Sequence, residues 1–145
     1  PVKVTYIGNW TDTAAAKEAA ISYVDAGADV LLGNADFATQ GVFQAMAEKN
    51  VMGWSIFGDN SDKAPQSILG SALVDYGAGL VTMASEVKAG TYKPEKNYEF
   101  GLKDTEVYSI VYNPKAATKI PDDVMKEAEG IIEKIKSGEI NTLAK

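Results

Sequence analysis

The sequence predicts an α/β fold, a parallel sheet flanked by helices, because strand-like and helix-like segments alternate along its first 57 residues. Apolar segments at 2–7, 28–32 and 51–57 each end at a glycine followed by a polar residue. A strand, a helix and another strand in succession indicate crossover connections, which parallel strands need and antiparallel strands do not. The composition agrees, since 145 residues with 46% hydrophobic and 23% charged residues suit one globular core.

The first crossover unit is predicted over residues 1–32. A strand is expected at 2–7, where β-branched residues and a tyrosine precede a Gly-Asn pair. A helix follows, with Thr11 or Thr13 as its cap and Gly27 just past its end. The apolar residues 28–32 then predict the second strand.

Later elements continue this rhythm and then depart from it. Strands that lie between crossover helices are typically buried on both faces. The last helix begins at Pro121, carries an apolar stripe and ends at Gly138. Between the second strand and this last helix, the predicted elements are a helix at 38–49, strands at 51–57 and 67–74, a helix at 76–88, and short strands at 98–102 and 107–112.

Charge and missing residue types exclude several classes of function. The chain has 14 lysines, no arginine and 20 acidic residues, a net charge of −6, so neither nucleic acid nor an anionic membrane surface is an expected partner. It has no histidine and no cysteine, which excludes Ser-His-Asp and Cys-His catalysis, the usual zinc sites, disulfides and iron–sulfur clusters. No apolar run is long enough to predict a membrane span.

Three loops are expected to meet where the first three strands end, because ligands of open parallel sheets bind beyond the carboxyl ends of the strands. Each loop combines glycine, asparagine and aspartate, and two of them add an aromatic residue. Such a set suits a planar, hydroxylated small molecule such as a sugar or nucleoside. The candidate ligand-binding residues of these loops are Trp10, Asp12, Asn34, Asp36, Phe37, Asp59, Asn60 and Asp62.

Structural roles for the same residues remain open. Glycine, asparagine and aspartate are ordinary residues of turns and helix caps, so any of these loops could be only a turn. Trp10 could cover the edge of the sheet, and Phe37 could pack on the helix that follows it. An enzyme in which Asp12, Asp36 and Asp59 gather around Mg²⁺ is an alternative, although the carboxylate pair and the lysine of phosphotransfer domains are not recognisable. We therefore assign no catalytic residue, metal or cofactor.

The loops and their surroundings resemble the second lobe of the basic-membrane-protein (BMP) family of substrate-binding lipoproteins. The resemblance covers nearly the whole chain, and its landmarks occur in the family's order. They are the run from Tyr6 to Asp12, Gly27-Ala28-Asp29-Val30, Gly41-Val42-Phe43-Gln44-Ala45, Gly58 with Asn60-Ser61-Asp62, Gly101-Leu102-Lys103-Asp104, Tyr112-Asn113-Pro114, and the closing residues 131–140.

This resemblance implies a two-lobed type I periplasmic-binding-protein fold that serves an ABC importer without enzymatic activity. Residues 1–67 and 92–145 would form the second lobe, and 68–91 would be a strand–helix excursion that packs on the first lobe or on a second copy of the chain. The first lobe, a signal peptide and a lipid-carrying cysteine would precede Pro1, which would place the protein outside the cytoplasm. The implied partners are an ABC permease and a purine nucleoside or similar ligand.

The resemblance also implies roles for individual residues. Trp10 matches the aromatic residue that stacks on the base, Asn34 and Asp36 lie in a loop that approaches the ligand, and Asn60 and Asp62 face the sugar. Asp75, with Tyr76 after it, resembles a branch that places Asn or Asp before an aromatic residue. The chain departs from many members at Asp36 and Phe37, where they have glycines, and at Val74, where some have a nearby lysine.

A second interpretation keeps the same fold but gives it a different output. In a ligand-sensing module, the lobe would report on a small molecule to an attached signalling partner instead of a permease. Sequence beyond this segment separates the two interpretations. A lipid-attachment cysteine favours transport, and a membrane span followed by a signalling unit favours sensing.

Overall fold

The computed structural model describes residues 1–95 and 97–142. Its helices and strands agree closely with most of the predicted elements. In chain order they are α1 (Thr13–Asp25), β1 (Val30–Leu32), the 3₁₀ helix η1 (Asp36–Ala38), α2 (Thr39–Lys49), β2 (Met52–Phe57), β3 (Ile68–Val74), α3 (Tyr76–Ala89), β4 (Tyr108–Tyr112) and α4 (Asp122–Ser137).

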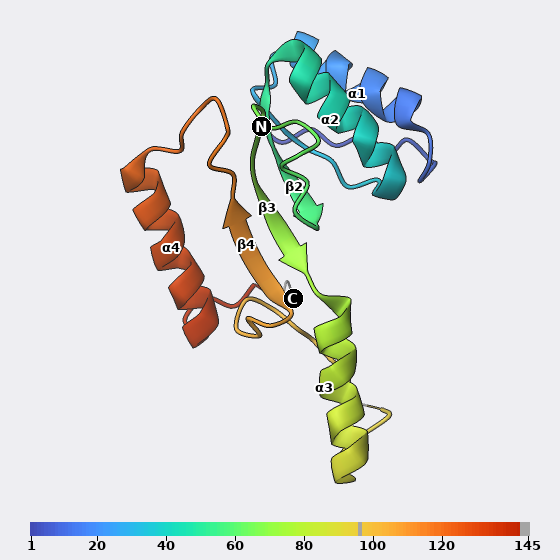
Figure 1. The fold of residues 1–145 in the computed structure, drawn as a ribbon, viewed down its shortest axis with the longest axis vertical. Helices are drawn as coiled ribbons and strands as arrows, with labels where there is room; N and C mark the ends of the chain where they lie inside the picture. The colour runs from blue at the N-terminus through green and yellow to red at the C-terminus, as the bar shows by residue number, and fades with distance from the viewer. Residues whose placement is uncertain (96, 143–145) are drawn as a thin grey trace. The chain divides into compact units, whose positions relative to one another are not determined.

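The four strands form one sheet in the order β1-β2-β3-β4 (Figure 1). β1 and β2 are parallel, with Val30 opposite Met52 and Leu32 opposite Trp54. The arrows in Figure 1 show that β4 runs opposite to β3, so the sheet is mixed but mostly parallel. The predicted α/β class is confirmed.

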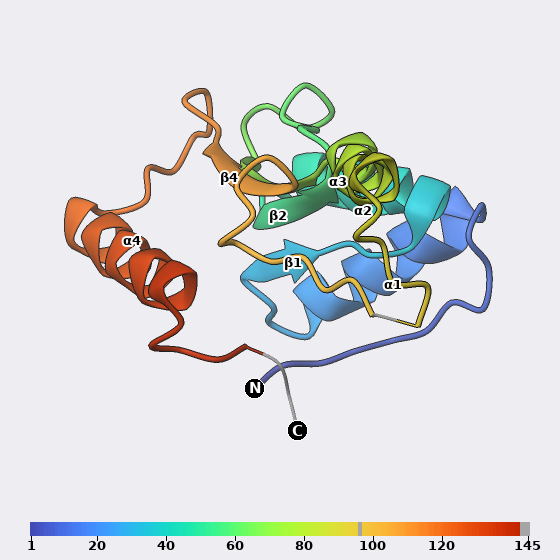
Figure 2. The ribbon, with the colours of Figure 1, turned by 90° about the horizontal axis from the view of Figure 1, so that it is seen from below.

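Helices α1 and α2 lie side by side on one face of the sheet (Figure 2). Gly41 of α2 lies at a close approach of α1 and α2, because a Cβ there would lie 2.0 Å from the carbonyl oxygen of Thr13 in α1. Beneath these helices lies a core of buried apolar side chains. Its buried members are Ala20, Leu31, Phe43, Ala45, Met46, Val51, Ala64 and Ile68.

Residues 2–7 do not form the predicted first strand. The segment belongs to no strand, and the side chains of residues 2–6 are exposed, with Tyr6 at 92%, while Ile7 is partly buried. The Thr5 hydroxyl is hydrogen-bonded to the Tyr23 hydroxyl of α1, so the segment is tethered to the helix. A strand pattern specifies a tendency to pair but not a partner, and β1 forms its ladder with β2 instead.

β1 also differs from the prediction that these strands are buried on both faces. Leu31 is buried in the core, whereas Val30 and Leu32 point the other way and are exposed. The reason is that α1 and α2 both cover the same face of the sheet. The alternation of side chains along β1 therefore places one apolar face in solvent.

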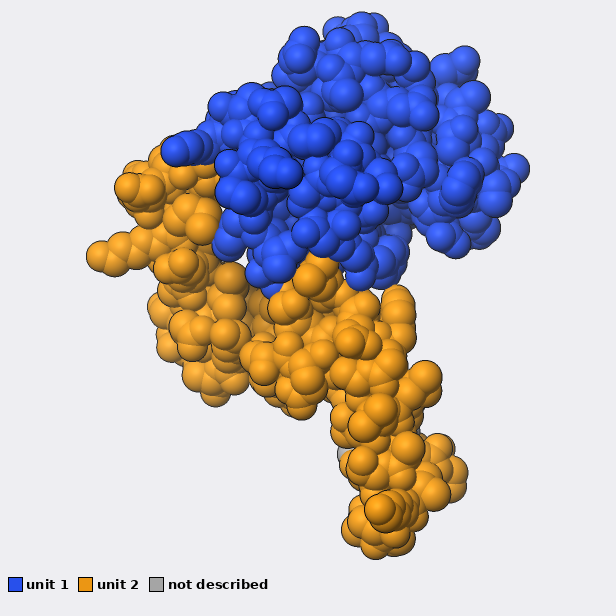
Figure 3. All heavy atoms as spheres, in the orientation of Figure 1, with its two compact units in different colours: residues 1–72, 110–119 blue, residues 73–109, 120–145 orange. Residues whose placement is uncertain are grey.

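The chain divides into two compact units, shown in blue and orange in Figure 3. Unit 1 comprises residues 1–72 and 110–119, and unit 2 comprises residues 73–109 and 120–145. β3 and β4 both continue from one unit into the other along the chain. Among the described residues, no helix has the length and apolar character to cross a membrane.

Within unit 2, the predicted strand at 98–102 is absent. Residues 98–100 have no regular structure, and two turns follow, in which the Asp104 N–H donates to the Gly101 carbonyl and the Val107 N–H donates to the Asp104 carbonyl. The Phe100 ring packs against Gly79 of α3 instead of joining a sheet. Tyr98 stacks on Tyr92 with ring centres 5.9 Å apart. Helix packing thus uses the aromatic residues that the strand prediction placed in a ladder.

Candidate ligand-binding edge of the sheet

The first loop, residues 8–12, presents Trp10 to solvent from a hydrogen-bonded turn. The Asn9 side-chain oxygen accepts hydrogen bonds from the Thr11 and Asp12 N–H groups at 2.7 and 3.1 Å. Asp12 caps α1, because its carboxylate accepts the Ala15 N–H at 2.9 Å. Trp10 is 66% exposed between these two fixed residues. Its ring therefore projects from a hydrogen-bonded turn and does not pack in the core.

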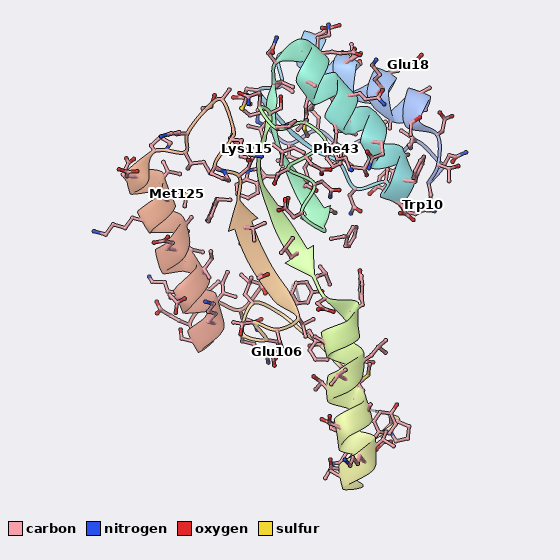
Figure 4. All side chains as sticks on the ribbon, in the orientation of Figure 1. Trp10, Glu18, Phe43, Glu106, Lys115 and Met125 are labelled. Atoms are coloured by element: carbon pink, nitrogen blue, oxygen red, sulfur yellow. The ribbon has the colours of Figure 1, made fainter. Side chains whose placement is uncertain are left out.

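The second loop lies directly against the first. The Trp10 carbonyl accepts the Ala38 N–H at 2.9 Å, which joins residues 8–12 to η1. Phe37 of η1 is 63% exposed, and Asn34 and Asp36 are also exposed. Figure 4 shows Trp10 beside the beginning of α2, where η1 ends. The structure thus brings the candidate residues of the first two loops together.

The third loop, residues 58–62, is held by buried hydroxyl groups. The Asn60 amide donates to the Ser55 hydroxyl at 2.7 Å and to the Gly58 carbonyl at 3.0 Å, and its backbone N–H donates to the Ser71 hydroxyl. Ser55 and Ser71 are both fully buried. Asn60 therefore has a structural role, with both amide protons directed at the protein.

The two carboxylates of the third loop have local partners. The Ser61 hydroxyl, and after it the Ser61 backbone N–H, donates to Asp59 and lowers the pKa of that carboxyl. Asp62 forms an ion pair with Lys63 at 2.9 Å. Both side chains are exposed, so carboxylate oxygens are available as acceptors at the protein surface.

One residue at this edge was not predicted as part of the site. Phe57, the last residue of β2, is 47% exposed and has φ of 72°, in the left-handed region. The sequence pattern predicts a strand through Phe57 and gives no sign of this backbone conformation. Its position next to Gly58 is the only sequence signal that could have singled it out.

Asp75, the remaining candidate, belongs to unit 2. It caps α3, because its carboxylate accepts the Ala78 N–H at 2.9 Å. Its own N–H donates to the Val107 carbonyl at 2.8 Å. Within unit 2, Asp75 therefore fixes the start of a helix.

An open pocket of about 430 Å³ adjoins the third loop in unit 1. Asp59, Ser61 and Asp62 line one part of it, and Tyr112, Asn113 and Lys115 line another. None of its lining residues comes from the first two loops. Figure 4 shows Lys115 well apart from Trp10. The pocket therefore extends from the third loop to residues 112–115 and does not include the aromatic edge, by which we mean the exposed rings of Trp10 and Phe37.

The chemistry available at the aromatic edge is recognition by contact and hydrogen bonding. Exposed rings provide flat apolar surfaces, and the carboxylates provide acceptors for hydroxyl and amino groups. Among residues 1–95 and 97–142, no three acidic side chains gather closely enough to hold a metal ion. The magnesium alternative, which needs Asp12, Asp36 and Asp59 together, gains no support from this arrangement.

Comparisons with known proteins agree with a binding role. The sequence matches the family Bmp, described as ABC transporter substrate-binding protein PnrA-like, over residues 1–144. A curated relative, a purine-binding protein of Brucella abortus, is 29% identical over 140 residues. The match covers 97% of this chain but 38% of that protein. The chain thus spans well under half the length of the curated relative.

Solved structures share the fold at lower identity. An ABC transporter solute-binding protein from Aeropyrum pernix has a TM-score of 0.79 at 20% identity, and a protein from Bacillus halodurans titled a transcriptional activator of the comK gene has 0.80 at 21%. Each match covers 97% of this chain and 47% or 48% of the other. The predicted fold of a periplasmic-binding-protein lobe is confirmed, and the matched family is one of substrate-binding proteins, as predicted. The chain belongs to the Bmp family of PnrA-like ABC transporter substrate-binding proteins.

Proposed function

We propose that this chain is the second lobe of a substrate-binding protein that delivers a purine nucleoside or a closely related compound to an ABC importer. The observation that carries the proposal is the exposed Trp10 ring, which is held by its backbone to the second loop. A flat ring beside the ends of parallel strands fits the planar base of such a ligand. The curated relative's name supports the purine class.

The polar residues of the edge fit the rest of such a ligand. Asn34 and Asp36 are exposed next to Phe37, and Asp59 and Asp62 are exposed beyond the end of β2. Carboxylates and amide groups at these places can accept and donate hydrogen bonds to a ribose or to the edge of a base. Asn60, whose amide protons bind the protein, would contribute its carbonyl oxygen.

The remaining parts of the proposal concern partners. Residues 1–67 and 92–145 form one lobe, and residues 68–91 pack on the other lobe or on a second copy of the chain. The ligand is enclosed between two lobes, and Asp75 is a further candidate contact. The protein works outside the cytoplasm as a lipoprotein and docks on a permease, and the net charge of −6 argues against nucleic acid as a partner.

Substitution of Trp10 tests the function. In the protein as its gene encodes it, Trp10→Ala is expected to weaken binding of adenosine or guanosine roughly tenfold or more, since stacking contributes about 1–3 kcal/mol per base. Isothermal titration calorimetry measures the change. Trp10→Phe keeps an aromatic face and is expected to lose much less.

Stability measurements separate a binding role from a structural one. Trp10 is largely exposed, so neither variant should lower the melting temperature by more than a degree or two. Full affinity in Trp10→Ala, or no binding of any purine base or nucleoside by the wild-type protein, would contradict the proposed function.

A further inference from the structure

Among the residues that the structure describes, three other than glycine have φ in the left-handed region: Asp36, Asn50 and Phe57. Asn50 terminates α2 in a conformation common at helix ends, and asparagine tolerates it well. Aspartate is also among the residues that adopt this region more readily. Phe57 is different, because a bulky side chain adopts positive φ only at a cost in free energy. Something other than backbone preference therefore favours phenylalanine here.

Packing does not explain Phe57. By the alternation of β2 its side chain belongs to the face of Gly53 and Ser55, which are both buried. Phe57 lies past the end of that covered region and is 47% exposed. A large apolar side chain that is half exposed and stands on a strained backbone contributes little to the core.

The neighbouring structure holds Phe57 in this conformation. The Asn60 amide bridges the Ser55 hydroxyl and the Gly58 carbonyl, so it ties together the residues on either side of Phe57. Ser55 is itself buried. Strained residues persist where their surroundings fix them, and they concentrate at binding sites.

The topology places Phe57 near the aromatic edge. β1 and β2 are parallel, and Leu32, the last residue of β1, is opposite Trp54. β2 therefore continues past β1 to Phe57 while the chain after β1 turns into the loop with Phe37. That loop is hydrogen-bonded to Trp10 through Ala38. The ends of β1 and β2 thus place Trp10, Phe37 and Phe57 at one edge of the sheet.

We propose that Phe57 contacts the ligand as a specificity-determining residue, its ring providing a second wall of the site whose first wall is Trp10. The inference rests on the proposed function, which supplies the planar ligand, but it concerns Phe57, to which the proposed function gives no role. A ligand contact by Phe57 would explain why an exposed aromatic residue is kept at a strained backbone position.

The test replaces Phe57 by glycine, which adopts positive φ freely. For Phe57→Gly in the protein as its gene encodes it, we expect affinity for adenosine and guanosine to fall at least tenfold. The melting temperature should stay the same or rise, because the strain is relieved. Asn50→Gly is the matched control, since it also places glycine at positive φ, and we expect it to leave affinity unchanged.

Two further variants identify what the ring contributes. Phe57→Tyr keeps an aromatic face and is expected to retain affinity within about threefold, whereas Phe57→Leu keeps apolar bulk and strain but is expected to bind at least fivefold more weakly. Changes in the ratio of adenosine to guanosine affinity would mark Phe57 as a specificity residue.

The outcomes separate this inference from the proposed function. If wild-type protein binds a purine nucleoside and Phe57→Gly binds it equally well, Phe57 is not a ligand contact and the inference is wrong while the function stands. A lower melting temperature with unchanged affinity would assign Phe57 a packing role. If Trp10→Ala and wild type both fail to bind any purine probe, the proposed function itself fails.

Discussion

At the scale of single residues, the contact between α1 and α2 depends on Gly41. A Cβ at this position would lie 2.0 Å from the Thr13 carbonyl oxygen and 2.8 Å from the Lys17 nitrogen, both rigid backbone atoms. Gly41→Ala should gain about 1 kcal/mol in helix propensity but lose more by forcing the helices apart, since overpacking costs about 1–3 kcal/mol. We expect a net loss in the free energy of unfolding, measured by urea denaturation.

Gly130 of α4 is the matched control for Gly41. It also lies inside a helix, but a Cβ there meets no atom within 4 Å. Gly130→Ala should therefore show the propensity gain alone, a stabilisation of about 1 kcal/mol. Equal effects from the two substitutions would mean that α1 and α2 are not in close contact.

Tyr98 provides a residue-scale prediction about pH. The hydrogen bond from its hydroxyl to Glu86 raises the pKa of Tyr98 to about 12, from 10.0. Because the folded form keeps the proton more tightly, the associated stability is present below pH 10.0 and is lost as the pH rises toward about 12. In absorbance titration we expect one tyrosine to ionise late. Tyr98→Phe should abolish that phase, and its persistence would contradict the assignment.

Residue chemistry also explains which candidate site residues could be identified from sequence. Trp10 and Phe37 were identifiable because no strand or helix pattern requires an aromatic residue where they stand, and both are exposed. Asp12 and Asp75 fit a cap as well as a site, and the structure uses each as a cap. Phe57 could not be identified as a candidate, because an apolar strand pattern does not indicate a φ of 72°.

At the scale of elements, sequence patterns located helices well because their ends carry local signals. Asp12, Asp75 and Gly138 begin or end helices through contacts within a few residues. Strands depend on a partner elsewhere in the chain, and this is why residues 2–7 and 98–102 were predicted wrongly. Both segments have strand-like composition, yet one is tethered to α1 and the other packs Phe100 against α3 without regular structure.

The unpaired state of residues 2–7 can be measured directly. In the 145-residue polypeptide we expect their amides to exchange with solvent within seconds, because the segment belongs to no ladder. Amides in α1 and α2, which pack over the core, should be protected by several orders of magnitude. Hydrogen–deuterium exchange with mass spectrometry distinguishes the segments. Strong protection of residues 2–7 would show that they pair with a strand after all.

At the scale of the whole molecule, α3 presents an apolar surface that nothing among the described residues of unit 2 covers. Leu80, Val81 and Val87 are exposed, and only Gly79 of this helix is buried. Burial of such side chains is worth about 1.5–3 kcal/mol each, which is large beside the net stability of a small domain. The other lobe or a second copy of the chain would remove this surface from water.

Self-association of the 145-residue polypeptide follows from this surface. We expect sedimentation equilibrium to show a reversible dimer or larger species, because two α3 helices can bury their stripes against each other. A Leu80→Ser and Val81→Ser double variant should weaken association at least tenfold, since each substitution removes a large part of the apolar contact. Lys88→Ser changes another exposed residue of α3 and should have little effect. A wild-type polypeptide that stays monomeric at high concentration would show that α3 folds back onto its own chain, and the proposed docking of residues 68–91 would then be wrong.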